Sequence, residues 1–131
     1  MRRFTLLALA AIVLAVGWQY AGRLEGYLYP VVRDVAVTLH SPPGAHVSEV
    51  SATFRKARNC RFLEMHWHRV TVSGSDIVHV SYGGGSAPPG NVTLGFGPTV
   101  IDMPSDDIVE HSFGEAIHRC HALWLTRTRL H

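Results

Sequence analysis

The chain has 131 residues, of which 47% are hydrophobic and 17% are charged, and its formal net charge is +2. This length allows one small domain, and the ordinary composition argues against a disordered chain. Arg2 and Arg3 supply two positive charges, so the remainder is near neutral, which argues against a dedicated nucleic-acid-binding protein.

The N-terminus carries two arginines followed by an uncharged, mostly apolar run, Phe4 to Gly22. Basic residues before such a run are typical of an export signal, and they stay on the cytoplasmic side. The run is either a signal peptide cut near Ala15–Gly17 or an uncleaved anchor, which needs roughly 20 residues to cross the bilayer. We favour the anchor, with Trp18 and Tyr20 at the far membrane interface.

Three segments follow from this interpretation. We expect a signal anchor or transmembrane helix in residues 1–22, a juxtamembrane connector in residues 23–30 and a β-rich domain in residues 31–131. The connector has helical spacing and should end before Pro30. The protein should therefore be a single-pass protein of the cytoplasmic (inner) membrane, with its N-terminus inside and its domain in the periplasm or outside the cell.

The pattern of residues 31–131 is that of short strands separated by turns. Apolar residues alternate with polar ones, with Val35, Val37 and Leu39 on one face and Val50, Ala52 and Phe54 on another. We expect a mostly β fold, a small antiparallel sandwich or barrel. The expected strands are 31–39, 50–55, 61–72, 77–82, 92–96 and one long, possibly bent strand at 115–128, with a helix allowed at 105–116.

Cys60 and Cys120 are the only cysteines, and an exported chain meets an oxidising compartment, so we expect a disulfide between them. Their separation is similar to that of the bridge between the two sheets of immunoglobulin-like sandwiches, with Trp67 as the candidate packing partner. Strict alternation with Met65 and Trp67 points Cys60 away from the core, unless a bulge intervenes or Cys60 precedes the strand.

The chain has nine histidines, and two local pairs have the spacing of strand-borne metal ligands. His66 and His68 share one strand face, and His118 and Cys120 share another. If the strands were neighbours, these four residues could bind zinc, although Cys120 cannot also form the disulfide. The interpretation we favour has no metal: His66 and His68 face solvent, and His118 is partly buried.

No catalytic signature is present in the sequence. The glycines of Gly83–Ser86 lack the lysine of a phosphate-binding loop, and there is no nucleophile elbow. We therefore expect no enzyme activity, no catalytic residues and no cofactor. The glycine- and proline-rich stretch Gly83–Asn91 is predicted to be a flexible loop and a contact site for a partner.

Two stretches, Phe54–Phe62 and His118–Trp124, each surround one cysteine. Through them the chain resembles a group of small, membrane-anchored, uncharacterised proteins encoded in tailed-phage and prophage genomes. The resemblance implies export and an immunoglobulin-like β domain with two cysteines, and it implies no activity.

Three functions remain open. The first is a non-enzymatic, membrane-anchored β domain that binds or spaces an unidentified protein outside the cytoplasmic membrane. The second is a periplasmic metal-binding domain that uses His66, His68 and His118. The third is an accessory subunit of an envelope or phage-related assembly, in which the anchor helix itself does the binding. All three use the membrane as a partner through the N-terminal helix, and none uses nucleic acid.

Overall fold

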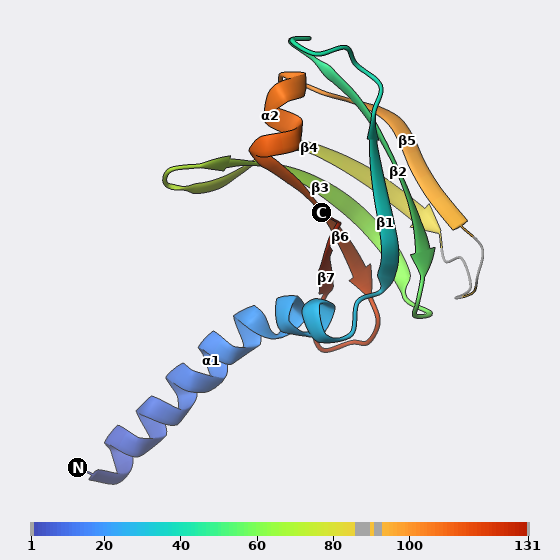
Figure 1. Ribbon diagram of the computed structural model, residues 1–131. Helices are drawn as coiled ribbons and strands as arrows, with labels where there is room; N and C mark the ends of the chain where they lie inside the picture. The colour runs from blue at the N-terminus through green and yellow to red at the C-terminus, as the bar shows by residue number, and fades with distance from the viewer. Residues whose placement is uncertain (1, 86–89, 91–92, 131) are drawn as a thin grey trace.

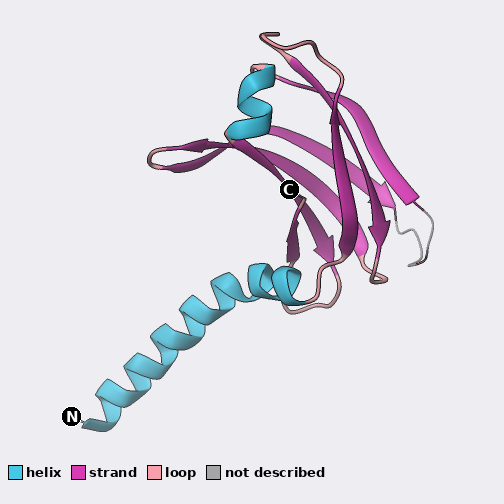
Figure 2. Cartoon of the chain, viewed as in Figure 1, coloured by secondary structure: helices cyan, strands magenta, loops and turns pink. Residues whose placement is uncertain are grey.

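A computed structural model describes residues 2–85, 90 and 93–130 of the chain (Figure 1). One long N-terminal helix, α1 (Arg2–Leu28), leads into a domain made of two antiparallel sheets and one short helix (Figure 2). The strands are β1 (Val32–Leu39), β2 (Ser48–Lys56), β3 (Arg61–Thr71), β4 (Gly74–Gly85), β5 (Thr93–Ile101), β6 (Ser112–Arg119) and β7 (Thr126–Arg129). The prediction of a mostly β fold preceded by an apolar helix is confirmed.

Helix α1 has two parts with different surroundings. The segment Phe4–Leu28 is long and apolar enough to cross a membrane, and its most apolar stretch is not buried in the protein. The last turns instead lie against β7 (Figure 1). Residues 23–28, which the sequence marked as a connector, continue the same helix, and the Tyr29 amide donates to the Glu25 carbonyl at 2.7 Å before the chain turns at Pro30.

The strands form a three-stranded sheet in the order β1-β2-β5 and a four-stranded sheet in the order β4-β3-β6-β7. Their inner faces share one core, in which Val50 of β2 and Ile101 of β5 pack with Met65 and Trp67 of β3. Burial of each such side chain contributes roughly 1.5–3 kcal/mol, so this cluster is the main source of stability of the domain. The immunoglobulin-like topology stays a prediction.

The alternation that predicted the strand faces agrees with their burial. Val50 and Ala52 are buried, and Phe54 packs against the core from the same face of β2. The odd-numbered apolar residues of β1, Val35, Val37 and Leu39, also pack against it.

The region after residue 96 differs from the prediction. Strand β5 continues through Pro98 to Ile101, because Gly97 and Pro98 form a bulge opposite Ser51 on a strand at the edge of its sheet, where a missing amide is tolerated. The allowed helix is confined to α2 (Ser105–Glu110), since Ser112 onward pairs with β3.

The predicted single long strand at 115–128 is wrong. Strands β6 and β7 are separated by a turn and pair antiparallel with each other, with Ile117 opposite Arg127. The intervening residues Ala122–Leu125 are apolar and contain neither glycine nor proline, so no turn signal interrupted the pattern in the sequence.

Candidate functional site

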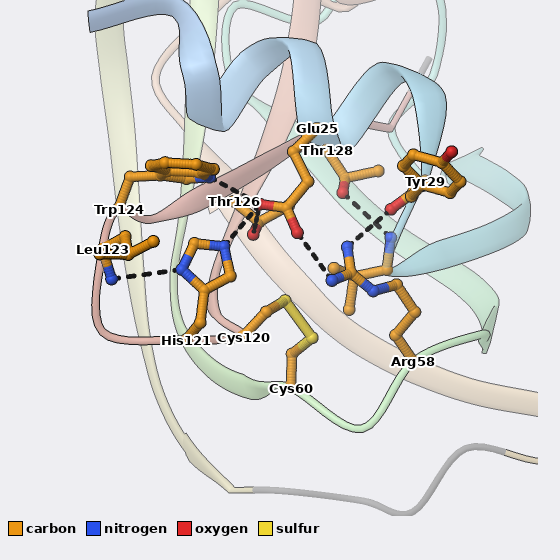
Figure 3. A network of polar contacts seen from close by, with 11 residues as sticks. Glu25, Tyr29, Arg58, Cys60, Cys120, His121, Leu123, Trp124, Thr126 and Thr128 are labelled. Carbon is orange, nitrogen blue, oxygen red and sulfur yellow. Dashed lines mark hydrogen bonds and ion pairs between the residues drawn. A yellow bond between two sulfur atoms is a disulfide. The ribbon is translucent and has the colours of Figure 1, made fainter. Parts of the chain in front are cut away.

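The first candidate site lies where α1 meets the domain, and it is centred on Glu25 (Figure 3). Its carboxylate accepts four hydrogen bonds, at 2.7 Å from Arg58 Nη2, 2.7 Å from Trp124 Nε1, 2.9 Å from Thr126 Oγ1 and 3.0 Å from His121 Nε2. The donors come from the β2–β3 connection, the β6–β7 turn and β7. We call these five residues the Glu25 network.

The protonation states in the Glu25 network follow from its hydrogen bonds. The Leu123 amide donates to His121 Nδ1 at 3.2 Å, so a neutral His121 carries its proton on Nε2, which faces the carboxylate. Glu25 lies beyond the uncharged run that ends at Gly22. Burial alone would raise the pKa of Glu25, but the hydrogen bonds from Arg58, Trp124, Thr126 and His121 outweigh it and lower the pKa to about 2.

Two glycines allow α1 to approach β7 closely. Gly22 and Gly26 are four residues apart and so share one face of the helix. A Cβ atom at Gly22 would overlap with the Leu125 carbonyl oxygen, and one at Gly26 with the Arg127 carbonyl oxygen. The junction between helix and domain is therefore tightly packed as well as hydrogen-bonded.

The expected disulfide between Cys60 and Cys120 is present, and it lies beside the Glu25 network (Figure 3). It does not join the two sheets. Cys60 immediately precedes β3 and Cys120 immediately follows β6, which are neighbouring strands of one sheet. Because Cys60 lies before β3, the alternation of Met65 and Trp67 along that strand does not determine the direction of its side chain. Trp67 is not its packing partner, because Trp67 pairs with Gly114, well along the strands from the cysteines, and donates to Ser112 Oγ at 2.9 Å.

The residues predicted to lie at the membrane interface, Trp18 and Tyr20, are both exposed on α1. Trp18 makes an edge contact with Trp124, with ring centroids 5.5 Å apart, and Trp124 in turn contacts the ring of His121. The aromatic side chain predicted at the interface is thus directly connected to the Glu25 network.

The second candidate site is a group of ionisable side chains on the outer face of the four-stranded sheet. His66 and His68 of β3 and Glu115 of β6 each offer one ligand atom, and these atoms lie within 4.8 Å of one another. Strand pairing brings them together, because His66 lies opposite Glu115 in the register. We call these three residues the histidine cluster.

The histidine cluster contains buried nitrogen atoms that lack hydrogen bonds. Among the described residues, His66 Nδ1 and both ring nitrogens of His68 have no partner. His68 Nε2 lies 3.7 Å from Glu115 Oε2, beyond hydrogen-bond distance, and the two side chains are only 8% and 9% exposed. Burial lowers the pKa of His68, and the Glu115 carboxylate opposes that shift.

The surroundings of the histidine cluster are charged. Arg127 Nη1 donates to Glu115 Oε2 at 2.9 Å, and Arg23 Nε lies 3.8 Å from Glu115 Oε1. His66 Nε2 lies 3.1 Å from a Glu64 oxygen. Two imidazoles and a carboxylate are a ligand set for zinc and similar ions. Tetrahedral zinc would hold such atoms about 3.4 Å apart, so ligand atoms that now lie up to 4.8 Å apart must approach one another by up to about 1.4 Å.

The structure contradicts the favoured prediction for His66 and His68, and it also contradicts the alternative set of four metal ligands. His66 and His68 do not face open solvent: His68 is 6% exposed and the side chain of His66 is 14% exposed. His118 and Cys120 do not join them. Along β6, residues 115 and 118 point to opposite faces, so His118 is directed between the sheets, and Cys120 is in the disulfide.

Sequence reasoning missed Glu25 and Glu115. Glu25 is separated from its partner Trp124 by 99 residues, so no local pattern signals the contact. Its one signal is that it is the single acidic residue of a long and mostly apolar helix. The predicted contact loop Gly83–Asn91 begins with three residues, 83–85, that belong to strand β4, so the loop prediction is wrong there. Its residues 86–89 and 91 lie outside the described part of the chain.

Comparisons with protein-family models, with curated proteins and with solved structures find no match to this chain. The geometry of its own residues is therefore the basis for assigning its function.

Proposed function

We propose that the chain is a membrane-anchored β domain, held outside the cytoplasmic membrane by α1, that binds or positions a partner and carries out no catalysis. Its N-terminus lies in the cytoplasm. It serves as an accessory protein of the cell envelope, a role compatible with the export that the resemblance to phage-encoded and prophage-encoded proteins implies.

The observation that carries the proposal is the Glu25 network. A domain that needs only to stay near the membrane can be tied to its helix by a flexible linker. Here the end of α1 is instead fixed to three separate segments of the domain through one ionised carboxylate. Charge-assisted hydrogen bonds of this kind are stronger and more directional than neutral ones. The arrangement fixes the orientation of the domain relative to the helix, which is a property of a positioning device.

Topology is tested with reporters fused to the C-terminus. Alkaline phosphatase, which is active only outside the cytoplasm, should be active in the fusion, and green fluorescent protein exported through the same route should be dark. Reversing the N-terminal charges with Arg2→Glu and Arg3→Glu should reduce the phosphatase signal. A fluorescent, phosphatase-negative fusion would exclude the proposed location.

Rigid positioning is tested by measuring distances between spin labels on the full chain in lipid nanodiscs. Labels attached to non-canonical residues at Leu9 on α1 and Val72 on the domain, both exposed, should give one narrow distance distribution. Glu25→Gln should broaden it, whereas Glu49→Gln, an exposed acid on β2, should not. An equally narrow distribution in the Glu25 variant would remove the support for positioning.

A second candidate function is metal binding. The buried nitrogens of the histidine cluster favour it, because they have no partner in the described part of the chain. The ligand set differs from the one predicted, since Glu115 takes the place of His118 and Cys120. A divalent ion such as Zn²⁺ would satisfy His68 and His66 together, at the cost of part of the ion pair between Glu115 and Arg127.

Equilibrium dialysis of the full chain against Zn²⁺, followed by elemental analysis, tests this candidate. We expect one zinc per chain, lost in His68→Ala and Glu115→Gln. The matched controls are His118→Ala and His79→Ala; His79 on β4 pairs with Ser81 instead. Zinc retained by His68→Ala, or lost equally in a control, would reject the histidine cluster as the site.

A further inference from the structure

The β6–β7 turn, residues 120–125, presents an apolar surface beside the membrane helix. Its sequence, Cys-His-Ala-Leu-Trp-Leu, contains no acidic residue, lysine or arginine. Ala122 and Leu123 are exposed, Leu123 to 58%. Turns that face water are usually built from glycine, proline and small polar residues. The composition of this turn therefore favours an environment other than water.

Two contacts fix the level of the β6–β7 turn along α1. The Leu125 carbonyl oxygen lies against Gly22, the last residue of the uncharged run, where a Cβ atom would overlap with it. The Trp124 ring makes its edge contact with Trp18, about one helical turn earlier. In Figure 3 Trp124 lies below the earlier, darker blue turns of α1. From Leu125 to Trp124 the turn therefore approaches the interior of the uncharged run.

The membrane boundary lies in this same stretch of α1. As a helix, the uncharged run Phe4–Gly22 is about 28 Å long, close to the roughly 30 Å of hydrocarbon in a bilayer. Arg23, the first charged residue after the run, belongs on the aqueous side. Trp18 lies about 6 Å before Gly22 along the helix axis, at the depth where tryptophan is enriched in membrane proteins. A ring in contact with Trp18 therefore lies at the membrane interface as well.

The polar side chains of the turn are already paired within the protein. Trp124 Nε1 donates to Glu25 Oε2 at 2.7 Å, and His121 Nε2 donates to the same oxygen at 3.0 Å. The exposed side chains of Ala122 and Leu123 consist only of hydrocarbon. Transfer of a polar group out of water is costly mainly when that group has no hydrogen bond. These side chains can therefore enter the membrane interface at little cost.

Two arginines lie beside the β6–β7 turn. Arg61 at the start of β3 and Arg119 at the end of β6 are both exposed, and they lie opposite each other in the strand register. The disulfide joins the two residues next to them, Cys60 and Cys120, and so ties both strand ends to the turn. Like charges directly opposite each other are destabilising, and an anionic group bound by both arginines compensates the repulsion. Lipid phosphates supply such groups at the membrane surface.

We propose that the β6–β7 turn is a second membrane-binding element: Leu123 inserts into the bilayer interface, while Arg61 and Arg119 bind the phosphate groups of anionic lipids. The inference deepens the proposed function and rests on it, because it requires α1 to span the membrane. A single helix leaves the tilt of its domain relative to the membrane free, and aromatic and arginine anchors at the interface restrict it. The turn thus orients the domain relative to the membrane plane, as the Glu25 network orients it relative to the helix.

The test uses the full chain in nanodiscs of phosphatidylcholine and phosphatidylglycerol, with a benzophenone amino acid at one exposed position at a time. After illumination, adducts of the protein with lipid are counted by mass spectrometry. We expect lipid adducts from Leu123 in the turn and from Leu9 in α1. The control position is Val109 on α2, which is exposed at the far end of the domain from α1 and should give none (Figure 1).

The two arginines give the second arm. Replacing both, with Arg61→Gln and Arg119→Gln, should lower the ratio of phosphatidylglycerol to phosphatidylcholine adducts at Leu123 about fivefold for each charge removed. Arg55→Gln is the matched control, because Arg55 is already paired with Asp34 at 3.3 Å, and it should leave the ratio unchanged.

The outcomes separate this inference from the proposed function. Lipid adducts at Leu9 without adducts at Leu123 would overturn the inference and leave the membrane anchor in place. An absence of lipid adducts at Leu9 would reject both. Adducts at Leu123 that join two copies of the protein, in place of lipid, would assign the turn to self-association and overturn the inference. An unchanged lipid ratio in the double-arginine variant would also overturn it.

Discussion

Two polar regions of this protein contrast in how completely their buried groups are paired. In the Glu25 network every carboxylate oxygen accepts a hydrogen bond, and the histidine that joins it has partners on both ring nitrogens. In the histidine cluster, three buried ring nitrogens have no partner among the described residues. A satisfied buried network stabilises one conformation, whereas an unsatisfied one costs free energy unless a ligand completes it. The contrast separates a structural junction from a candidate binding site.

The largest expected effect comes from the disulfide, which holds together the two connections that supply Arg58 and His121. Its cysteines are 60 residues apart, and the chain-entropy model gives about 4 kcal/mol for closing a loop of this length. Replacing Cys60 and Cys120 by alanine should lower the free energy of unfolding by that amount, measured by urea unfolding of the full chain in nanodiscs. A loss below about 1 kcal/mol would indicate that the Glu25 network holds these connections without the covalent bond.

The next effect is that of the carboxylate itself. Glu25→Gln removes the charge that four donors share, and breaking such a partly buried pair should cost about 3 kcal/mol. The folded pKa of about 2 lies below the unfolded value of 4.5, so the contribution of Glu25 is present above pH 4.5 and is lost as the pH falls from 4.5 towards 2. The Glu25→Gln variant should be less stable than the original chain at pH 7. Between pH 4.5 and pH 2 its free energy of unfolding should fall less than that of the original chain. Glu49→Gln is the control, and identical acid profiles would contradict the assignment.

His118 should produce a separate pH dependence at higher pH. Burial lowers its folded pKa to about 4, below the ordinary value of 6.5, so the unfolded chain gains a proton first and stability falls as the pH drops from 6.5 to 4. Between pH 7 and pH 5 the loss should be about 2 kcal/mol. His118→Leu should remove this loss, and the same change at the exposed His46 should not. Urea unfolding curves of each protein at three pH values between 7 and 5 measure this loss of stability.

The smallest effect has the opposite sign and is the sharpest test of the contrast. In metal-free protein two buried nitrogens of His68 have no partner among the residues that the structure describes, so His68→Leu should stabilise the fold by about 1 kcal/mol. Zn²⁺ should stabilise the original chain, by about 2.7 kcal/mol at a hundred times the dissociation constant, and have no effect on the variant. If the variant is destabilised instead, through loss of the ring stack on Phe113, His68 is a structural residue.

The local parts of this structure were predictable, and the contacts between distant segments were not. The uncharged run predicted the apolar helix, and alternation predicted which face of β2 carries Val50 and Ala52. The disulfide followed from the expected compartment. Each of these inferences depends only on neighbours along the chain or on the chemistry of one residue type.

The candidate sites depend on contacts between distant segments, and the alternation of apolar and polar residues along a strand does not reveal such contacts. Alternation correctly placed His66 and His68 on the face opposite Trp67, but it could not show that Glu115, Arg127 and neighbouring side chains cover that face. The turn between β6 and β7 was missed because its apolar sequence gives no sign of Glu25, which binds Trp124 from the other end of the chain.

The close packing of α1 on β7 also bears on how the domain avoids self-association. Strand β7 is at the end of its sheet, and the Leu130 amide bonds to Gly114 on the inner side. The carbonyls of Leu125 and Arg127 point the other way, onto Gly22 and Gly26. An uncovered strand edge is a template for pairing with another chain, and here the helix occupies it. A domain without its helix would therefore expose a strand edge that can pair with other chains and aggregate. The last two turns of α1 thus keep the domain soluble as well as attaching it to the membrane helix.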